Sequence, residues 1–407
     1  MVLKLEGLWP PVTINDPTTL WADHPSFVAQ ECFFIIAATA VWLAHRQNDA
    51  PRNRVLFWTV VFGGNLIEIL TGLESEIGCF WESQAVAMVL GGRFPFYCVW
   101  GMYVFMGYLP TALAMACDLD PLGEAGLAAL VGGFLYQTFG ILGNKHLWWV
   151  FHVDERLFDD RWFGDPAAHP FWMTATAWSI PLAVRAFAPD DRVGHGAVLL
   201  RSFACAVSAY LVLINVPFLC FYYPATFNGV SGYWALHFFR AACALCVWRG
   251  RRRAAPPPAK KAKRSKAPAS PDQSVVVAGF AADRHRNGAL ALSWLGVILA
   301  LSSSCDPARV RRTGFGQFLL CNSGTETSFW GLFVREAGLC PRDVRPEEHN
   351  FCVCDGETPP ADGREWYTLC GAAMDEGTHA WLALHAFLAA ATILYAVSRA
   401  KDAAKLE

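Results

Sequence analysis

Long apolar segments separated by short polar loops dominate the hydropathy pattern of this chain. A run of about 20 apolar residues can cross a bilayer as a helix, whereas runs of about 10 to 14 residues are too short. Seven such segments precede residue 249 and two follow it. We therefore expect an all-α, multi-pass transmembrane helical bundle of about nine spans, at 27–44, 55–73, 94–117, 122–143, 170–188, 197–221, 230–248, 287–304 and 378–398.

A basic segment, RGRRRAAPPPAKKAKRSK at residues 249–266, determines the expected orientation. Lys and Arg beside spanning helices stay on the cytoplasmic side. With nine spans, this rule places the N-terminus outside and the C-terminus inside. The expected organisation is an outer tail (1–26), a seven-span membrane domain (27–248), a basic disordered cytoplasmic linker (249–286), an eighth span (287–304), a cysteine-rich outer loop (305–377), a ninth span (378–398) and a cytoplasmic tail (399–407).

The same basic segment also suggests a partner. A stretch so rich in Lys, Arg and Pro cannot bury apolar surface, so we expect it to be disordered. It acts either as a tether that fixes topology or as a contact for anionic lipid headgroups, at about 1 kcal/mol per basic residue. The lipid bilayer is the expected partner, and no nucleic acid is expected.

Composition agrees with a membrane protein. Hydrophobic residues make up 54% of the chain and charged residues only 17%, against about 25% charged in soluble domains. The 17 Trp and 29 Phe are many, and aromatic rings gather at membrane interfaces. A large soluble protein is thereby disfavoured, and we expect an integral membrane protein.

Six cysteines fall in the predicted outer loop, which is otherwise polar. An even number in such a loop predicts three disulfides, with connectivity left open. A zinc site at His349, Cys352 and Cys354 is the alternative, and it requires a reducing compartment and hence the opposite orientation. An oxidised loop fits the plasma membrane or a secretory-pathway membrane. The predicted disulfide cysteines are Cys305, Cys321, Cys340, Cys352, Cys354 and Cys370.

Polar side chains within the predicted spans cluster toward the outer side. A charge at mid-bilayer costs about 2.5–3.5 kcal/mol and usually faces a cavity or a partner. Glu31 and Glu68 are the candidate catalytic residues, because a carboxyl group kept protonated by desolvation can act as a general acid. The candidate ligand-binding residues are Asn65, Arg93, Gln137, His146, His152, Asp154, His237 and Arg240.

Three interpretations of this cluster stay open. Glu68 and Arg240 form a structural pair, or the cluster lines an outward-facing pocket for a small hydrophobic ligand, or it forms an ion path. Residues 144–168 would roof the pocket. Part of that loop has apolar residues near helical spacing, which favours an interfacial amphipathic helix. No metal-binding, phosphate-binding or nucleophile-elbow motif is present, so we expect no metal and no cofactor.

Several local motifs together resemble an uncharacterised eukaryotic family of multi-pass membrane proteins, a domain of unknown function. They are HPSFVAQE (His24 to Glu31), Glu68 in the second span, FWESQ (Phe80–Gln84), GGRFPFY (Gly91–Tyr97) and the WWVFHVD…DDRW element (Trp148–Trp162). That family usually has Asp-Pro after the Trp-Trp-x-x-His pattern, whereas Glu155 follows Asp154 here. The resemblance covers the first five spans, about half of the chain, and the cysteine-rich loop and last spans look like an addition.

The family implies no activity. The chain also has a weak likeness to membrane carotenoid hydratases and to integral-membrane terpene cyclases. The sequence therefore favours a multi-pass membrane protein of unknown activity with an outward-facing polar pocket. The alternatives are a membrane-embedded isoprenoid- or lipid-modifying enzyme, of cyclase or hydratase type with a Glu general acid, and a receptor or transporter.

Overall fold

The computed structural model describes most of the chain. The described residues are 11–47, 51–73, 80–82, 85–90, 92, 94–117, 119–152, 159–188, 195–253, 273–313, 324–328, 333–336, 351–353 and 368–403.

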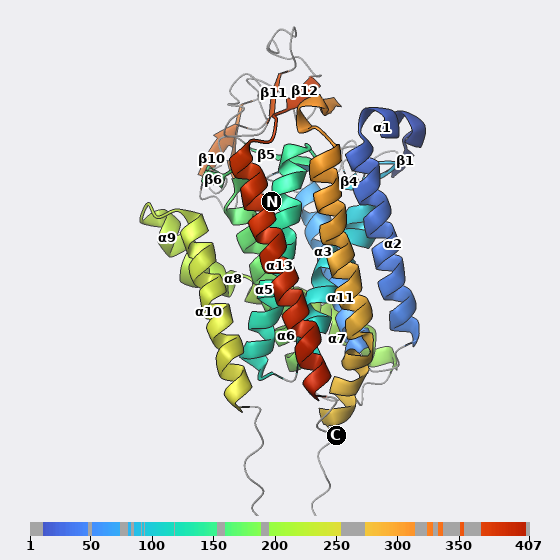
Figure 1. Ribbon diagram of the computed structural model, residues 1–407, viewed down its shortest axis with the longest axis vertical. Helices are drawn as coiled ribbons and strands as arrows, with labels where there is room; N and C mark the ends of the chain where they lie inside the picture. Colours follow the sequence, from blue (N-terminus) through green and yellow to red (C-terminus); the bar gives the residue numbers. More distant parts are fainter. Residues whose placement is uncertain are drawn as a thin grey trace, which may run out of the picture.

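A bundle of long helices forms the body of the protein (Figure 1). Its core helix is α5 (Pro121–Lys145). It packs against α4 (Leu109–Met115), α6 (Ala168–Phe187), α10 (Gly232–Arg253) and α13 (Glu376–Ala403). Asp120 caps α5 by accepting a hydrogen bond from Gly123 N (2.8 Å), and Pro121 follows at the first helical position, where its missing N–H costs nothing. The other long helices are α2 (Pro25–Gln47), α3 (Pro51–Leu73), α6 (Ala168–Phe187), α7 (His195–Val207), α10 (Gly232–Arg253), α11 (Gln273–Ser304) and α13 (Glu376–Ala403).

Two of the expected spans are irregular helices. One consists of π-helical η1 (Cys98–Met102) and η2 (Val104–Tyr108) followed by α4 (Leu109–Met115). The other continues α7 through η3 (Ser208–Leu213), α8 (Asn215–Pro217), η4 (Phe218–Tyr222) and α9 (Tyr223–Phe227). Pro110 and Pro217 lie within these stretches. Because proline has no N–H to donate, it interrupts the regular α-helical hydrogen bonds.

The structure supports six of the nine expected spans by length and composition. Within the described residues, the helices that are long and apolar enough to cross a membrane are Pro25–Leu43, Cys98–Met115, Pro121–Lys145, Gly196–Phe227, Asp283–Ser304 and Glu376–Arg399. The three other predicted segments are also helical, as α3, α6 and α10 of 23, 20 and 22 residues. They fall outside this set, so nine spans remain a prediction.

Short strands cover one end of the bundle (Figure 1). In antiparallel pairs, β1 (Val12–Ile14) lies on β3 (Ala87–Val89), β3 on β4 (Phe94–Pro95), and β2 (Phe80–Glu82) on β5 (Trp149–Phe151). The amphipathic helix expected within 144–168 is therefore wrong for the described part of that loop. Its apolar residues Leu147 and Phe151 are buried in the protein, which explains their apolar character without a helix.

The cysteine-rich loop contributes further strands at this end. β12 (Thr368–Gly371) lies between β8 (Arg311–Thr313) and β11 (Phe351–Val353), and β9 (Thr325–Ser328) pairs with β10 (Phe333–Glu336). On that hairpin, Arg335 and Glu326 are directly opposite and form an ion pair of 2.8 Å. The loop thus adds a small β structure over the helix ends.

The helices extend into the predicted linker from both sides. α10 continues to Arg253 and α11 begins at Gln273, so the expected disordered linker of 249–286 is wrong at both ends. Residues 254–272 lie outside the described part of the chain. In Figure 1, the C-terminal ends of α10 and α13 lie at the opposite end of the bundle from α1 (Pro17–Asp23), β11 and β12.

Candidate functional site

A buried carboxylate, Asp165, joins three helices near the strand-covered end. It lies in the hairpin of β6 (Arg161–Trp162) and β7 (Asp165–Pro166) and is 0% exposed. Its Oδ1 accepts a hydrogen bond from Asn144 Nδ2 (2.9 Å), and its Oδ2 accepts one from Gln137 Nε2 (2.9 Å). The Tyr233 hydroxyl donates to the main-chain oxygen of Asp165 (2.9 Å) and lies 3.4 Å from Oδ2.

His169 and Arg240 extend this polar cluster. The His169 Nδ1 lies 3.1 Å from Asp165 Oδ1, and its Nε2 lies 2.5 Å from the Tyr136 hydroxyl. Since a carboxylate can only accept, His169 Nδ1 donates to Asp165, and the other ring nitrogen is in hydrogen-bond contact with Tyr136. On the other side, Arg240 Nη2 donates to Gln137 Oε1 (3.2 Å). The chain of contacts therefore connects α5, α6 and α10.

Local backbone geometry brings Asp165 to this position. The hairpin turns at Phe163 (φ 54°) and Gly164 (φ 80°), in the left-handed region where glycine is favoured. Asp160, just before the hairpin, accepts hydrogen bonds from Ser231 Oγ (2.8 Å) and Gly232 N (2.5 Å) and so caps α10. A Cβ at Gly140 of α5 would lie 3.2 Å from Asp165 Oδ2, so only glycine gives the carboxylate this space without a shift.

The arrangement has the chemistry of a structural joint. Three side-chain donors and a tyrosine hydroxyl surround the Asp165 carboxylate. Buried polar networks are stable when every member is satisfied. The Asp165 oxygens are thus engaged by the protein itself, and we name Asp165, His169, Tyr136, Tyr233 and Asn144 the polar joint.

Only some of the predicted ligand-binding residues come together. Gln137 and Arg240 hydrogen-bond each other, and the His237 ring packs against those of Trp162 and Tyr233 at centroid distances of 6.0 and 6.4 Å. Arg93 and Asp154 lie outside the described residues.

Glu31 and Asn65 make contacts that are typical of structural residues. The Glu31 carboxylate accepts from Val86 N (2.8 Å) and Ala87 N (3.2 Å), which attaches β3 to α2. Asn65 Nδ2 donates to Val61 O (2.7 Å) in its own helix and to Val99 O (3.2 Å) in η1. Both side chains thus form hydrogen bonds with main-chain atoms of neighbouring segments and fix the positions of those segments.

Glu68 and Arg240 have different partners. Glu68 is 2% exposed, and its carboxyl group interacts electrostatically with the nearby Tyr103. Arg240 donates to Gly133 O (2.9 Å) and to Gln137, both on α5. In the part of the chain that the structure describes, the acceptors of Arg240 are on α5 and no ion pair joins it to Glu68. Of the three open interpretations, the structural pair of Glu68 and Arg240 is therefore not supported.

His146 and His152 are both buried where the end of α5 meets the strands. His146 follows the last residue of α5 and is 0% exposed. Burial lowers the pKa of its imidazole from 6.5 to about 4, an effect that the nearby Asp306 carboxylate opposes. His152 is 1% exposed, and its main-chain oxygen accepts from Arg161 Nη2 (2.8 Å).

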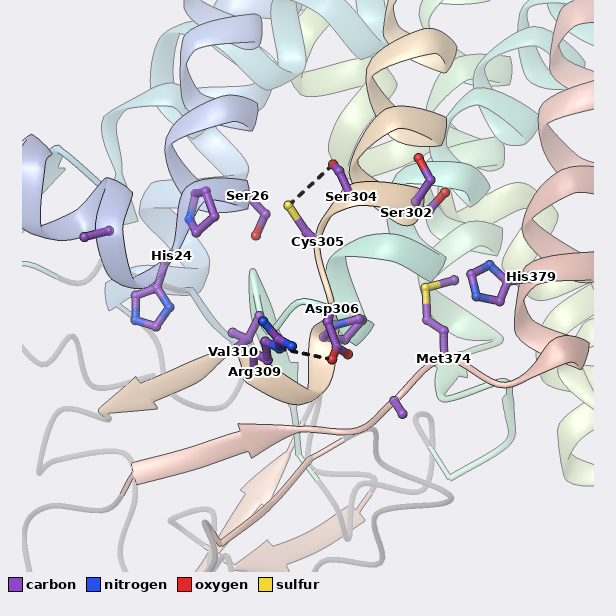
Figure 2. Close-up of a pocket in the computed structure, with 15 residues that line it drawn as sticks. His24, Ser26, Ser302, Ser304, Cys305, Asp306, Arg309, Val310, Met374 and His379 are labelled. Carbon is purple, nitrogen blue, oxygen red and sulfur yellow. Dashed lines mark hydrogen bonds and ion pairs between the residues drawn. The ribbon is translucent and has the colours of Figure 1, made fainter.

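A cavity of about 990 Å³ opens at the strand-covered end. Its walls come from the beginning of α2, the end of α11 and the segment before α13, which are far apart in the sequence (Figure 2). Hydroxyl, imidazole and thiol groups face it together with an Asp306–Arg309 ion pair (3.6 Å). The polar and sulfur-bearing residues of the wall are His24, Ser26, Ser302, Ser303, Ser304, Cys305, Asp306, Arg309, Met374 and His379.

Trp148 connects the cavity wall to His146, one of the predicted ligand-binding residues. Trp148 is fully buried and its Nε1 donates to Ser26 Oγ in the cavity wall (3.2 Å). The Trp148 ring lies 6.1 Å from that of His146. A polar cavity therefore lies beside the predicted Trp-rich loop, although different residues line it.

The predicted disulfide set is wrong for one member. Cys305 is a free thiol that faces the cavity, so the six cysteines do not form three bridges. Cys370 is disulfide-bonded, and the strand register places Cys352 directly opposite it. Cys321, Cys340 and Cys354 lie outside the described residues.

Sequence reasoning missed the polar joint and most of the cavity. Asp165 and His169 are four residues apart, which is a detectable signal, but the approach of Asn144, Gln137 and Tyr233 depends on the hairpin. The cavity residues share no local motif. Among the described residues, no group of three or more His, Cys, Asp or Glu side chains is placed to hold a metal.

The comparisons with known proteins identify a family. No curated protein and no solved structure matches the chain. Residues 9–399 match a family described as a domain of unknown function (DUF7802). The match is broader than the five spans expected from local motifs, and it includes the cysteine-rich loop and the last helices, which are therefore not an addition. The chain belongs to this family of unknown function, DUF7802.

Proposed function

We propose that the protein is a multi-pass integral membrane protein in which α3, α6 and α10 also cross the bilayer. Each has at least 20 residues, which at about 1.5 Å per residue reaches roughly 30 Å, the thickness of the hydrocarbon core. Arg251, Arg252 and Arg253 end α10. Because basic residues stay in the cytoplasm, the opposite end with the strands and the cavity faces outward.

The proposed function is the binding of a small molecule with polar groups in the outer cavity. The observation that carries it is the cavity of about 990 Å³ with its hydroxyl, imidazole and thiol lining. Small-molecule sites are typically about 300–1,000 Å³ and combine apolar walls with a few placed polar groups. Here Ala22, Pro25, Val310 and Met374 provide the apolar wall.

A pair of tryptophan substitutions on α11 tests this proposal. Ser303→Trp fills the cavity, because Ser303 is one of its lining residues. Leu299→Trp is the matched control, because Leu299 is one turn away, 45% exposed and outside the lining. Full-length protein in nanodiscs would be assayed by mass spectrometry for co-purified small molecules.

We expect a compound that is retained by the wild type and by Leu299→Trp and is strongly depleted in Ser303→Trp. Equal retention in both variants would contradict binding in the cavity. Absence of any retained compound in the wild type would also count against it.

Catalysis by Glu68 as a general acid on an isoprenoid or other lipid is a separate proposal. Its support is that Glu68 is buried beside Tyr103, whose hydroxyl can exchange a proton with a carboxyl group. Glu68→Gln keeps the side-chain shape. Folded but inactive protein would support the proposal, whereas loss of folded protein would indicate a structural role.

A further inference from the structure

Two donor atoms of the Arg240 guanidinium have no acceptor among the described residues. The residue is 4% exposed, and Nη2 donates to Gly133 O and Gln137 Oε1. In the part of the chain that the structure describes, Nε and Nη1 are buried and meet no acceptor. A guanidinium inside a membrane bundle is costly, and such groups usually mark a ligand or a pathway.

Among the described residues, the carboxylate that interacts electrostatically with Arg240 is that of Asp165, and it accepts from neither Nε nor Nη1. The Asp165 oxygens are engaged within the polar joint. His237, three residues earlier on α10, and His385 on α13 also interact electrostatically with Arg240. The Arg240 guanidinium lies 4.6 Å from the centre of the Phe134 ring, a favourable cation–π contact.

Phe134 belongs to the part of α5 that is open at the side of the bundle. From Gly123 to Lys145, every residue of α5 is buried except Leu130 and Phe134, which are partly exposed. Because they are four residues apart, they lie on one face of the helix. The Phe134 ring is 6.1 Å from that of His385, so this strip lies between α10 and α13, which both pack on α5 (Figure 1).

We propose that Arg240 binds the anionic head, a carboxylate or phosphate, of an amphipathic molecule that enters between α10 and α13 from the bilayer. The free guanidinium donors would bind the head, with imidazole nitrogens of His237 and His385 beside it. Leu130 and Phe134 would contact the hydrocarbon. The exposed Phe238 and Leu384, at 64% and 45%, extend the apolar surface on the two flanking helices. This site is distinct from the outer cavity, which none of these residues lines.

Thermal unfolding of the full chain in phosphatidylcholine nanodiscs tests the proposal with three probes. Oleate supplies an anionic head and a chain, oleyl alcohol supplies the chain without charge, and inorganic phosphate supplies a free anion. We expect oleate alone to raise the melting temperature of the wild type. Arg240→Gln should weaken oleate binding by about tenfold or more, because a charge-assisted contact is lost.

Arg46→Gln is the matched control. Arg46 also lies over an aromatic ring, 5.1 Å from the centre of Trp42, but it is exposed, and the variant should keep the oleate shift. The proposal is overturned by an absent oleate shift in the wild type, by an equal shift in Arg240→Gln, or by an equal shift with oleyl alcohol. If inorganic phosphate raised the melting temperature as much as oleate does, the ligand would be a free anion, and the proposal that it enters from the bilayer would be overturned.

A second measurement needs no variant and covers the case in which Arg240→Gln does not fold. A photoreactive fatty acid with a diazirine near its carboxyl group would be crosslinked to the wild-type protein in the same nanodiscs. We expect the modified peptides to contain residues 130–134, 237–241 or 381–385. Crosslinks confined to other segments would overturn the proposed site.

Discussion

Replacing Asp165 with alanine tests the polar joint most directly. The side chain accepts from Gln137, Asn144 and His169 and lies within reach of the Tyr233 hydroxyl. Hydrogen bonds in membrane bundles average about 0.6 kcal/mol, so four contacts set a lower limit of about 2 kcal/mol. Removal of one member of a buried charged network costs about 3–5 kcal/mol, because its partners stay buried without an acceptor. We expect Asp165→Ala to lower the free energy of unfolding by about 3 kcal/mol.

Reversible unfolding of the purified protein in mixed micelles, followed by tryptophan fluorescence, measures this loss. Glu376→Ala is the control, because Glu376 is an exposed carboxylate at the start of α13 and exposed substitutions usually change stability by less than about 0.5 kcal/mol. A loss of less than about 0.5 kcal/mol in Asp165→Ala would refute the joint as a main source of stability.

Three further predictions concern neighbouring positions. Gly140→Val places a branched side chain against Asp165, whose Oδ2 a Cβ would approach to 3.2 Å, so we expect a loss of about 1–3 kcal/mol in the same assay. Glu31→Ala removes the acceptor of two backbone N–H groups, and we expect a loss of about 1–3 kcal/mol and faster proteolysis near residue 86. His146 has a pKa lowered to about 4 by burial, so the unfolded chain binds its proton first as the pH falls. The contribution of the neutral His146 to the free energy of unfolding is retained above pH 6.5 and is lost as the pH falls toward 4, by about 2 kcal/mol between pH 7 and pH 5. We expect His146→Phe to reduce the pH dependence of the free energy of unfolding by that amount. An unchanged pH dependence in this variant would contradict the prediction.

The sequence predicted the helices well because span length leaves a strong signal. The runs at 122–143 and 378–398 lie within α5 and α13, since a helix must be this long to cross hydrocarbon. One predicted span is a less regular helix than expected, because it contains a proline. The stretch around Pro217 stays helical but contains π-helical turns, which hydropathy alone does not reveal.

The loops and the sites were harder to predict, because their contacts join distant residues. Trp149 belongs to a strand that pairs with β2, about 70 residues earlier, so the helical spacing in its loop was a coincidence of buried apolar positions. The cavity wall combines Ser26, Cys305 and His379, which only the packed bundle brings together. Gln137, His237 and Arg240 were recognised because polar groups are rare in spans, whereas Asp165 follows a polar loop and did not stand out.

The orientation of the bundle can be measured most directly in sealed microsomes that carry the full chain, with the cytoplasmic face outward. Trypsin should cut within 249–272, and a membrane-impermeant maleimide should modify Cys305, a free thiol in the cavity, only after detergent is added. Modification of Cys305 in sealed vesicles, together with protection of 249–272 from trypsin, would contradict an outward-facing cavity.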